Sequence, residues 1–320
     1  MRLVAVVGPT ASGKSALSLA IAAAFDGEII SCDSTAVYRG LDIGTDKLDA
    51  GQRRGIPHHL VDVVEPTEVY SAARYGQDAA AAVANISARS RLPIVVGGTG
   101  FYLRALVRGI FPGPGRDESL RARLNGVADR RGVESLHRWL TRVDEASGRR
   151  IQPRDRKRLV RALEVYVLTG RPLTDHFSDT VSPAGVLETL TIGVNVPRPA
   201  LLDRVSRRVD EQFERGVVDE VRRLVARGVP LSAHAFSGLV YRQVVDYLND
   251  VRDLASTREL VVRENMRYAK RQVTWFRKEP GVIWLEAPGE SSVAQHQALT
   301  LVREFLAGLS PEPQALSPKP

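Results

Sequence analysis

The stretch RLVAVVGPTASGKSALSLAIAAAF, residues 2–25, decides the fold. Its apolar start, 2–7, is typical of a short buried strand, and a helix rich in alanine and leucine is predicted from about Lys14 to Phe25. Between them, GPTASGKS (8–15) matches the P-loop pattern G-x-x-x-x-G-K-[ST], in which backbone N–H groups and a helix N-terminus surround phosphate oxygens. The residues expected to bind phosphate are Gly8, Pro9, Thr10, Ala11, Ser12, Gly13, Lys14 and Ser15. Within this set, Lys14 is expected on terminal phosphate oxygens and Ser15 on Mg²⁺.

Further apolar strands are predicted along the chain, alternating with helices. GEIISCD ends at Asp33, and LPIVVGG ends at Gly98 after a helical stretch over 72–90. TLTIGVNV (189–196) and VIWLEA, near residue 282, continue the series. Apolar strands alternating with helices indicate a parallel sheet covered on both faces. The fold class is therefore α/β, a P-loop NTPase-like core with an all-helical insertion domain.

The middle of the chain has a different pattern. Glycine and proline in FPGPGRD interrupt any helix, and residues from Glu118 to about Leu168 read as arginine-rich amphipathic helices without a strand. A polar, turn-rich stretch follows before the strand pattern resumes. The predicted domains are 1–111 as the first part of the core, 112–188 as the helical insert, 189–309 as the rest of the core with C-terminal helices and the last strand, and 310–320 as a disordered, proline-rich tail.

The charge is unevenly distributed. The formal net charge is +8, and residues 116–171 hold 15 Lys or Arg against eight Asp or Glu, so the basic surplus is concentrated in the insert and favours an anionic partner. No apolar run reaches the roughly 20 residues that a membrane span requires, and no secretory signal is evident, so we expect a cytoplasmic protein without a membrane partner. Cys32 has no cysteine companion for a disulfide or a zinc site, and we expect a small buried residue there.

The sheet edge beside the P-loop carries one acidic residue of interest. An ATPase of the P-loop class would place an aspartate for magnesium after a further strand, but PIVVGGTG offers glycines and Thr99 instead. Asp33, at the end of the second strand, lies on the same edge. Its ordinary alternative is a turn cap. His58 and His59 are adjacent, so their side chains point to opposite faces of a strand and do not share a metal.

Three functions remain open on these residues. A small-molecule or nucleotide kinase uses a P-loop and a neighbouring carboxylate for phosphoryl transfer. A non-enzymatic P-loop module that binds RNA is compatible with the basic insert. The third is an enzyme that uses the loop to bind a diphosphate-bearing substrate.

Several stretches resemble the tRNA dimethylallyltransferases, also called tRNA isopentenyltransferases, in order and approximate spacing. Besides the P-loop they are DSTAVYRGLDIGTDK (33–47), PHHLVD (57–62), YSAARY (70–75), GGTGFYLRAL (97–106), DRKRLVRALEVY (155–166) and YAKRQVTWFRK (268–278). The resemblance runs from Arg2 to about Trp284. It implies transfer of a dimethylallyl group from dimethylallyl diphosphate to N6 of the adenosine 3′-adjacent to the anticodon, in tRNAs that read codons beginning with U. It implies Mg²⁺ as cofactor and the tRNA anticodon stem-loop as partner, without ATP hydrolysis, and we expect a monomer.

The resemblance also assigns residues. Asp33 is the candidate base for the weakly nucleophilic adenine amine, and Thr99 helps to fix the diphosphate or the nucleotide. Arg242 matches a cation near the diphosphate, while Val240 stands where family members commonly carry glycine. The target base has to leave the anticodon stack to reach the pocket. The tRNA-binding set is Asp33, Ser34, Thr35, Ala36, Thr99, Arg121, Lys157, Arg158, Leu159, Val160, Arg161, Lys270 and Arg271. For each of these cations taken singly, a solvated surface charge is the ordinary alternative.

Overall fold

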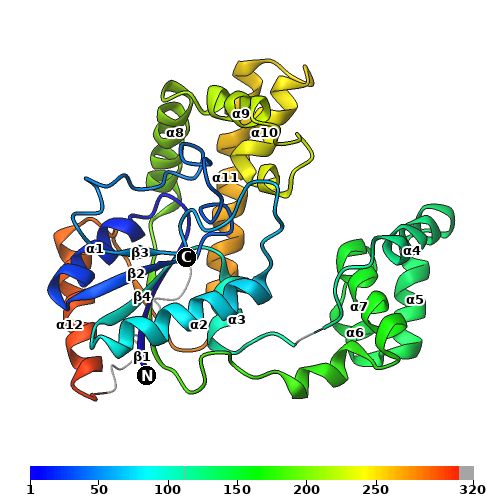
Figure 1. Ribbon diagram of the computed structural model, residues 1–320, viewed down its shortest axis with the longest axis horizontal. Helices are drawn as coiled ribbons and strands as arrows, with labels where there is room; N and C mark the ends of the chain where they lie inside the picture. Colours follow the sequence, from blue (N-terminus) through cyan, green and yellow to red (C-terminus); the bar gives the residue numbers. More distant parts are fainter. Residues whose placement is uncertain (112, 310–320) are drawn as a thin grey trace. The chain divides into compact units, whose positions relative to one another are not determined.

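The chain divides into two compact units (Figure 1). The computed structural model describes residues 1–111 and 113–309. The first unit contains Met1–Val107 and the described residues from Pro183 onward, and the second is Arg108–Ser182. The predicted insert, 112–188, has similar but not identical limits, because α3 already ends at Val107 and residues 183–187 lead into the strand that begins at Glu188. The tail predicted to be disordered, 310–320, lies outside the described residues.

A six-stranded parallel sheet forms the centre of the first unit, in the order β3-β2-β4-β1-β5-β6. The strands are β1 (Arg2–Val7), β2 (Gly27–Ser31), β3 (His58–His59), β4 (Leu92–Gly97), β5 (Glu188–Val194) and β6 (Val282–Leu285). Val4 of β1 is paired with Ile94 of β4 on one side and with Leu190 of β5 on the other. The predicted α/β class is confirmed. Because β1 is central, the loop that follows it lies between the carboxyl ends of its neighbours, where ligands bind in such sheets.

Helices cover both faces of this sheet. The first unit as a whole contains α1 (Lys14–Ala24), α2 (Ala72–Ala88), α3 (Gly100–Val107), α8 (Arg198–Glu214), α9 (Val217–Ala226), the 3₁₀ turn η2 (His234–Ser237), α10 (Leu239–Leu248), α11 (Leu254–Phe276) and α12 (Ser292–Leu306). Alternate residues of β1 serve the two faces: Val4 and Val6 pack in one cluster with α1 and α12, which lie side by side in Figure 1. Leu3, Ala5 and Val7 belong to the larger cluster on the other face. Burial of both faces explains why the strand reads as one continuous apolar run.

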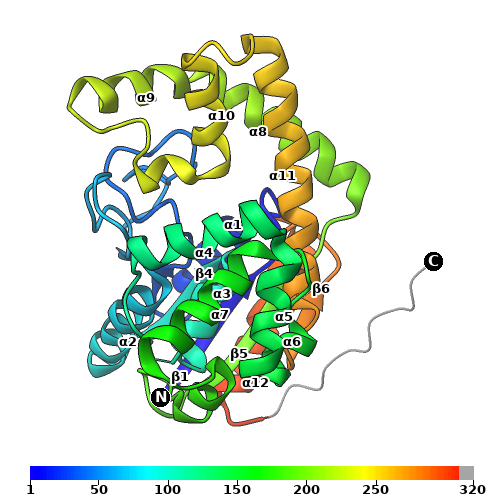
Figure 2. The same cartoon turned by 90° about the vertical axis from the view of Figure 1, so that its right-hand side faces the viewer.

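The helices α8 to α11 form a group at one end of the first unit (Figure 2). The longest, α11, has 23 residues and begins where the Asp253 side chain accepts a hydrogen bond from the Ser256 amide at 2.7 Å. It contacts α3, α8 and α10. Its inward face carries Ala269, Gln272 and Phe276, all buried. A polar Gln272 on this face requires hydrogen-bond partners, which the site below supplies.

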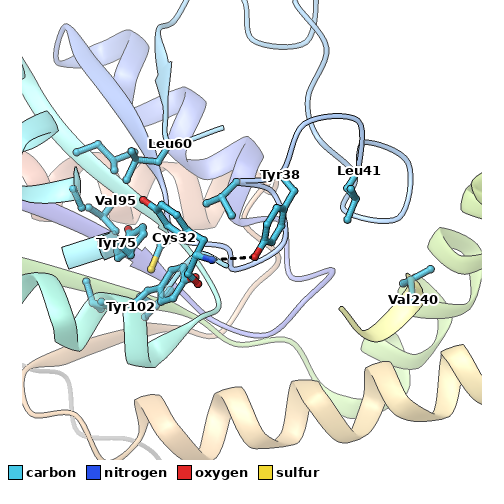
Figure 3. Packing of buried hydrophobic residues seen from close by; sticks show 14 of the residues in the cluster. Cys32, Tyr38, Leu41, Leu60, Tyr75, Val95, Tyr102 and Val240 are labelled. Carbon is cyan, nitrogen blue, oxygen red and sulfur yellow. Dashed lines mark hydrogen bonds between the residues drawn. The ribbon is translucent and has the colours of Figure 1, made fainter. Parts of the chain in front are cut away.

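An aromatic cluster lies under the end of β2 (Figure 3). Cys32 points toward the rings of Tyr75 and Tyr102, which stack at 4.2 Å between centroids. Burial raises the pKa of the Cys32 thiol to about 12, so it stays protonated, and the expectation of a small buried residue is confirmed. The dashed line in Figure 3 joins the Tyr38 hydroxyl to the Tyr70 amide, which donates to it at 3.3 Å. Asp33 therefore directly follows a residue, Cys32, that is fixed by packing.

The second unit is helical and has its own core. It contains α4 (Glu118–Arg131), α5 (Val133–Val143), α6 (Glu145–Arg150), α7 (Arg156–Thr169) and the 3₁₀ turn η1 (Leu173–Asp179). Leu124, Leu136, Leu140 and Leu163 are among the residues of its buried cluster. None of the helices in the described parts of the chain combines the length and hydrophobicity needed to cross a membrane.

Candidate active site

The loop after β1 has the backbone conformation that its glycines permit. Gly13 has a φ of 89°, and Ala11 also lies in the left-handed region, with φ 59°. A Cβ on Gly13 would come within 2.7 Å of the Gly289 nitrogen. The Gly289 amide in turn donates to the Ser12 carbonyl at 3.0 Å. The segment between β6 and α12 therefore packs directly against the loop, and Gly13 has no room for a side chain.

A cavity opens between this loop, the carboxyl halves of β2 and β4, and the segment 45–61. Its polar wall contains Lys14 and Ser15 from the start of α1, Asp33 from the end of β2, Gly98 after β4, and Arg208 from α8. Carboxyl ends of neighbouring parallel strands meet at one sheet edge, which is why residues so far apart in sequence share one wall. These five residues contribute two cations, a hydroxyl and a carboxylate to a lining that also includes Asp46, Lys47 and Arg53.

Lys14 is the first of the two cations. Its Nζ donates to the Pro9 carbonyl at 2.6 Å, so the amine lies folded over the loop. Burial, assisted by the positive charge of Arg208 and opposed by Asp33, lowers the pKa of Lys14 to about 7. Arg208 reaches the same loop, with Nη1 donating to Thr10 Oγ1 at 2.8 Å. Two cations held close together here favour an anionic ligand.

Asp33 stands at the end of β2 with one oxygen engaged. Its Oδ1 accepts hydrogen bonds from the Thr35 amide at 2.8 Å and the Ala36 amide at 3.2 Å. The turn-capping role, the ordinary alternative for this residue, is therefore present. It uses only one oxygen, and Oδ2 accepts no hydrogen bond from the described residues, so the carboxylate can also act as an acceptor in the cavity.

Thr99 and Tyr268 lie next to Asp33. The Thr99 hydroxyl accepts from the Ser34 amide at 3.3 Å. Burial and the negative charge of Asp33 raise the pKa of Tyr268 to about 12, although its hydrogen bonds to Thr99 and Gln272 oppose the shift. The tyrosine therefore keeps its proton at neutral pH.

A second cavity adjoins the first. Thr10, Asp33, Thr45, Arg208 and Tyr268 line both, so the two cavities meet at these side chains. The rest of the second wall comes from the loop after β2 and from η2, α10 and α11, and includes Ser34, Thr35, Tyr38, His234, Arg242, Asn265 and Arg271. Two adjoining cavities that share Asp33 can hold two reactants next to one carboxylate.

Arg242 lines the second cavity from α10, and the first cavity does not include it. Val240, two residues earlier, is helical and buried, without the positive φ that would require glycine. Two arginines of α8 contact the P-loop, Arg208 at Thr10 and Arg204 at the Ala11 carbonyl oxygen, 2.6 Å away, and the sequence singled out neither.

The predicted tRNA-binding residues of α7 and α11 differ in their exposure to solvent. Lys157, Arg158, Lys270 and Arg271 are exposed, and the Arg271 guanidinium lies 5.6 Å from the centre of the Tyr268 ring. Leu159 and Val160 belong instead to the buried core of the second unit, because the helical period turns these two positions of α7 inward. Their side chains were expected to contact RNA, and burial excludes that.

Two further arginines of the predicted tRNA set are engaged within the second unit. Arg121 makes a bidentate pair with the fully buried Glu164, through Nε at 2.7 Å and Nη2 at 2.8 Å. Arg161 Nη1 reaches the same carboxylate at 2.6 Å. Both arginines therefore neutralise a buried charge, which makes them structural as well as basic.

Gln272, Tyr268, Arg208 and Asp46 are site residues that sequence reasoning missed. Tyr268 and Gln272 lie within YAKRQVTWFRK (268–278), from which only Lys270 and Arg271 were predicted as contacts, and Arg208 is one of four arginines of α8. The only signal was a glutamine at a position that the helical period places on the buried face. Such a signal shows that a partner exists but does not identify it.

The two histidines of β3 have different hydrogen-bond partners. His59 Nε2 lies 2.6 Å from Glu28 Oε2, and His58 Nδ1 lies 2.8 Å from the Ile56 carbonyl oxygen. Across residues 1–111 and 113–309, no cluster of three or more His, Cys, Asp or Glu side chains is placed to hold a metal. Magnesium, however, usually takes one or two protein oxygens and fills its other positions with water and phosphate. The Ser15 hydroxyl lines the first cavity and fits that requirement.

Comparisons with known proteins give one consistent result. Residues 36–279 match the family model described as IPP transferase. A tRNA dimethylallyltransferase of Solibacter usitatus is 45% identical over 306 residues, covering 96% of this chain and 99% of that protein. One from Koribacter versatilis is 43% identical over 94% of this chain and 98% of its own length. The crystal structure of a tRNA isopentenylpyrophosphate transferase from Bacillus halodurans superposes with a TM-score of 0.69 at 37% identity and covers 96% of both chains.

Proposed function

This chain belongs to the IPP transferase family, and we propose that its two adjoining cavities carry out dimethylallyl transfer to tRNA. The donor is dimethylallyl diphosphate, and the acceptor is N6 of the adenosine 3′-adjacent to the anticodon. The products are N6-isopentenyladenosine and diphosphate. The observation that supports this best is the shared wall: Asp33 lines both the cavity that contains the P-loop and the one beside it.

The first cavity binds the diphosphate. Loop amides, Lys14 and Arg208 surround the position where negative charge grows as the carbon–oxygen bond breaks, and fixed positive groups stabilise such a leaving group. Ser15 would hold Mg²⁺, which when bound supplies further positive charge beside the departing diphosphate. A loop of this kind serves the diphosphate without any need for ATP hydrolysis.

The second cavity receives the adenine. The lone pair of N6 forms the bond to C1 of the dimethylallyl group, and the electron pair of the broken C1–O bond leaves with the diphosphate. The proton of N6 passes to Asp33, whose Oδ2 is open to an acceptor role. Thr99 and Tyr268, which lie next to Asp33, orient the adenine.

Exposed cations contact the tRNA backbone. Lys157 and Arg158 on α7 and Lys270 and Arg271 on α11 suit phosphate contacts, which position an RNA without reading its sequence.

The test is transfer itself. The protein is incubated with Mg²⁺, labelled dimethylallyl diphosphate and unmodified tRNA that carries adenosine 3′ of the anticodon, and label is then measured in the RNA. Label in that adenosine is expected, while the same tRNA with guanosine at the position should remain unlabelled. Phosphorylation of a small acceptor by ATP without transfer would establish a kinase instead, and RNA binding without either product would establish a binding module.

A further inference from the structure

Arg208 holds a fixed position beside the P-loop. Its Nη1 donates to Thr10 Oγ1 at 2.8 Å, and its Nη2 lies 3.5 Å from the Thr45 carbonyl oxygen. Arginine has a long, flexible side chain, and only about a third of this one is exposed. To bind a diphosphate in a defined orientation, the guanidinium requires a partner that fixes its Nε.

Asp46 is that partner. Its Oδ2 accepts from Arg208 Nε and also from Gln212 Nε2, the latter at 2.6 Å. Its Oδ1 accepts from Arg215 Nη1 at 3.2 Å. Because the carboxylate binds the Nε edge of Arg208, the two terminal NH₂ groups remain directed at Thr10 and the cavity.

The loop that carries Asp46 is rigidly attached to the rest of the fold. The buried Glu220 of α9 accepts hydrogen bonds from the Asp42 amide at 3.0 Å and the Ile43 amide at 2.8 Å. The Tyr241 hydroxyl accepts from the Gly44 amide at 3.0 Å and donates to Glu220 at 2.6 Å. These hydrogen bonds attach the loop to α9 and α10.

The backbone of Asp46 is unusual. Its φ of 51° is in the left-handed region, which aspartate tolerates better than most residues. Its amide donates to the Ile43 carbonyl at 3.1 Å, which closes the turn. The turn therefore presents the carboxylate toward three side chains of α8 and its C-terminal end, at positions 208, 212 and 215.

We propose that Asp46 is a positioning residue, which orients Arg208 so that its terminal NH₂ groups bind the diphosphate of the substrate. The proposal rests on the proposed function only because it identifies the bound diphosphate as part of the substrate. Asp46 acts through Arg208, and it therefore has no effect on diphosphate binding when Arg208 is absent.

The experiment is a double-mutant cycle read by equilibrium binding. Affinity for inorganic diphosphate, in the presence of Mg²⁺, is measured for the wild type, Asp46→Ala, Arg208→Ala and the double variant. Asp46→Ala is expected to weaken binding about tenfold in the wild type and less than twofold in the Arg208→Ala background. Asp219→Ala, which removes an exposed carboxylate paired with Arg222, is the matched control and should leave affinity unchanged.

Two outcomes would overturn the proposal. An equal loss in both backgrounds would show that Asp46 acts independently of Arg208, and tighter binding by Asp46→Ala would show that Asp46 competes with diphosphate. Thermal unfolding of each variant separates a loss of fold from a loss of orientation, and Asp46→Asn, which retains an acceptor oxygen at the same position, provides a milder second variant. Because inorganic diphosphate requires no transfer, the result stands apart from the transfer assay.

Discussion

The Gln272 side-chain oxygen accepts a hydrogen bond from the Thr10 amide at 2.9 Å, across 262 positions of the sequence. The amide nitrogen of the same glutamine donates to the Gly98 carbonyl at 3.0 Å. One side chain of α11 thus joins the P-loop to the loop after β4. This buried glutamine therefore fixes the two loops relative to each other.

Loss of this bridge should weaken diphosphate binding. Gln272→Ala leaves the Thr10 amide and the Gly98 carbonyl without partners, and we expect the unfolding free energy to fall by about 2 kcal/mol. The KM for dimethylallyl diphosphate should rise as the loop loosens. Steady-state kinetics and urea unfolding measure both effects, with the exposed Thr274→Ala on the same helix as control. An unchanged KM would mean that the P-loop keeps its shape without Gln272.

Diphosphate binding should take up a proton above neutral pH. Burial and Arg208 lower the pKa of Lys14 to about 7, so the amine is mostly neutral at pH 8 and must be protonated to pair with the anion. Below pH 7 it is already charged, so affinity should fall only as the pH rises beyond 7, by up to about tenfold per unit. Calorimetry at pH 8 in two buffers of different ionisation enthalpy, with dimethylallyl diphosphate and no tRNA, counts the protons. Equal uptake by Lys14→Met would contradict this role.

The second unit should depend on Glu164 for its stability. Burial by itself would raise the pKa of this carboxyl, but hydrogen bonds from Arg121, Arg161 and the Asp117 amide lower it to about 2. A lowered pKa means that the contribution is complete above the ordinary value of 4.5 and is lost as the pH falls toward 2. Glu164→Gln should cost about 3 kcal/mol at pH 7 and less at pH 3.

Urea unfolding followed by circular dichroism at the two pH values measures that difference. Glu145→Gln is the control, because it breaks only an exposed pair with Arg149 and should cost under about 0.5 kcal/mol. A cost for Glu164→Gln that does not change between pH 7 and pH 3 would contradict the assignment.

Binding of tRNA should fall with salt, and the exposed cations of α7 should contribute to the slope. Replacing Lys157 and Arg158 together by alanine is expected to reduce the slope of log K against log salt by up to about 2. Arg303→Ala on α12 serves as the control. If the slope of the double variant equals that of the wild type, α7 does not contact the RNA backbone.

The sequence specified the sheet core well because its signals are local. Residues 3–7 are apolar throughout because both faces of β1 are covered, and GPTASGKS can be recognised from the spacing of its own residues between a strand and a helix. Asp33 was found because the end of a parallel strand fixes its place at the sheet edge. Such features depend on neighbours in sequence.

The remaining site residues depend on contacts distant in sequence. Nothing near Arg208 predicts that it reaches Thr10, and nothing near Asp46 predicts that it meets Arg208, because helix periodicity gives the inward face but not what lies opposite. Leu159 and Val160 show the opposite error, since a motif taken as a continuous stretch includes the residues that the helix turns inward. Charge counts likewise could not show that Arg121 and Arg161 neutralise Glu164.

The most direct measurement compares Asp33→Asn with the wild type in two assays on the same protein: equilibrium binding of dimethylallyl diphosphate, and the single-turnover rate of transfer to tRNA. Asparagine keeps an oxygen that can accept from the Thr35 and Ala36 amides, so the loop is expected to hold its shape and the affinity to stay within about threefold of the wild type. Without a base for the N6 proton, the transfer rate should fall by about a hundredfold or more. Transfer by Asp33→Asn at the rate of the wild type would contradict the role of Asp33 as the base between the two cavities.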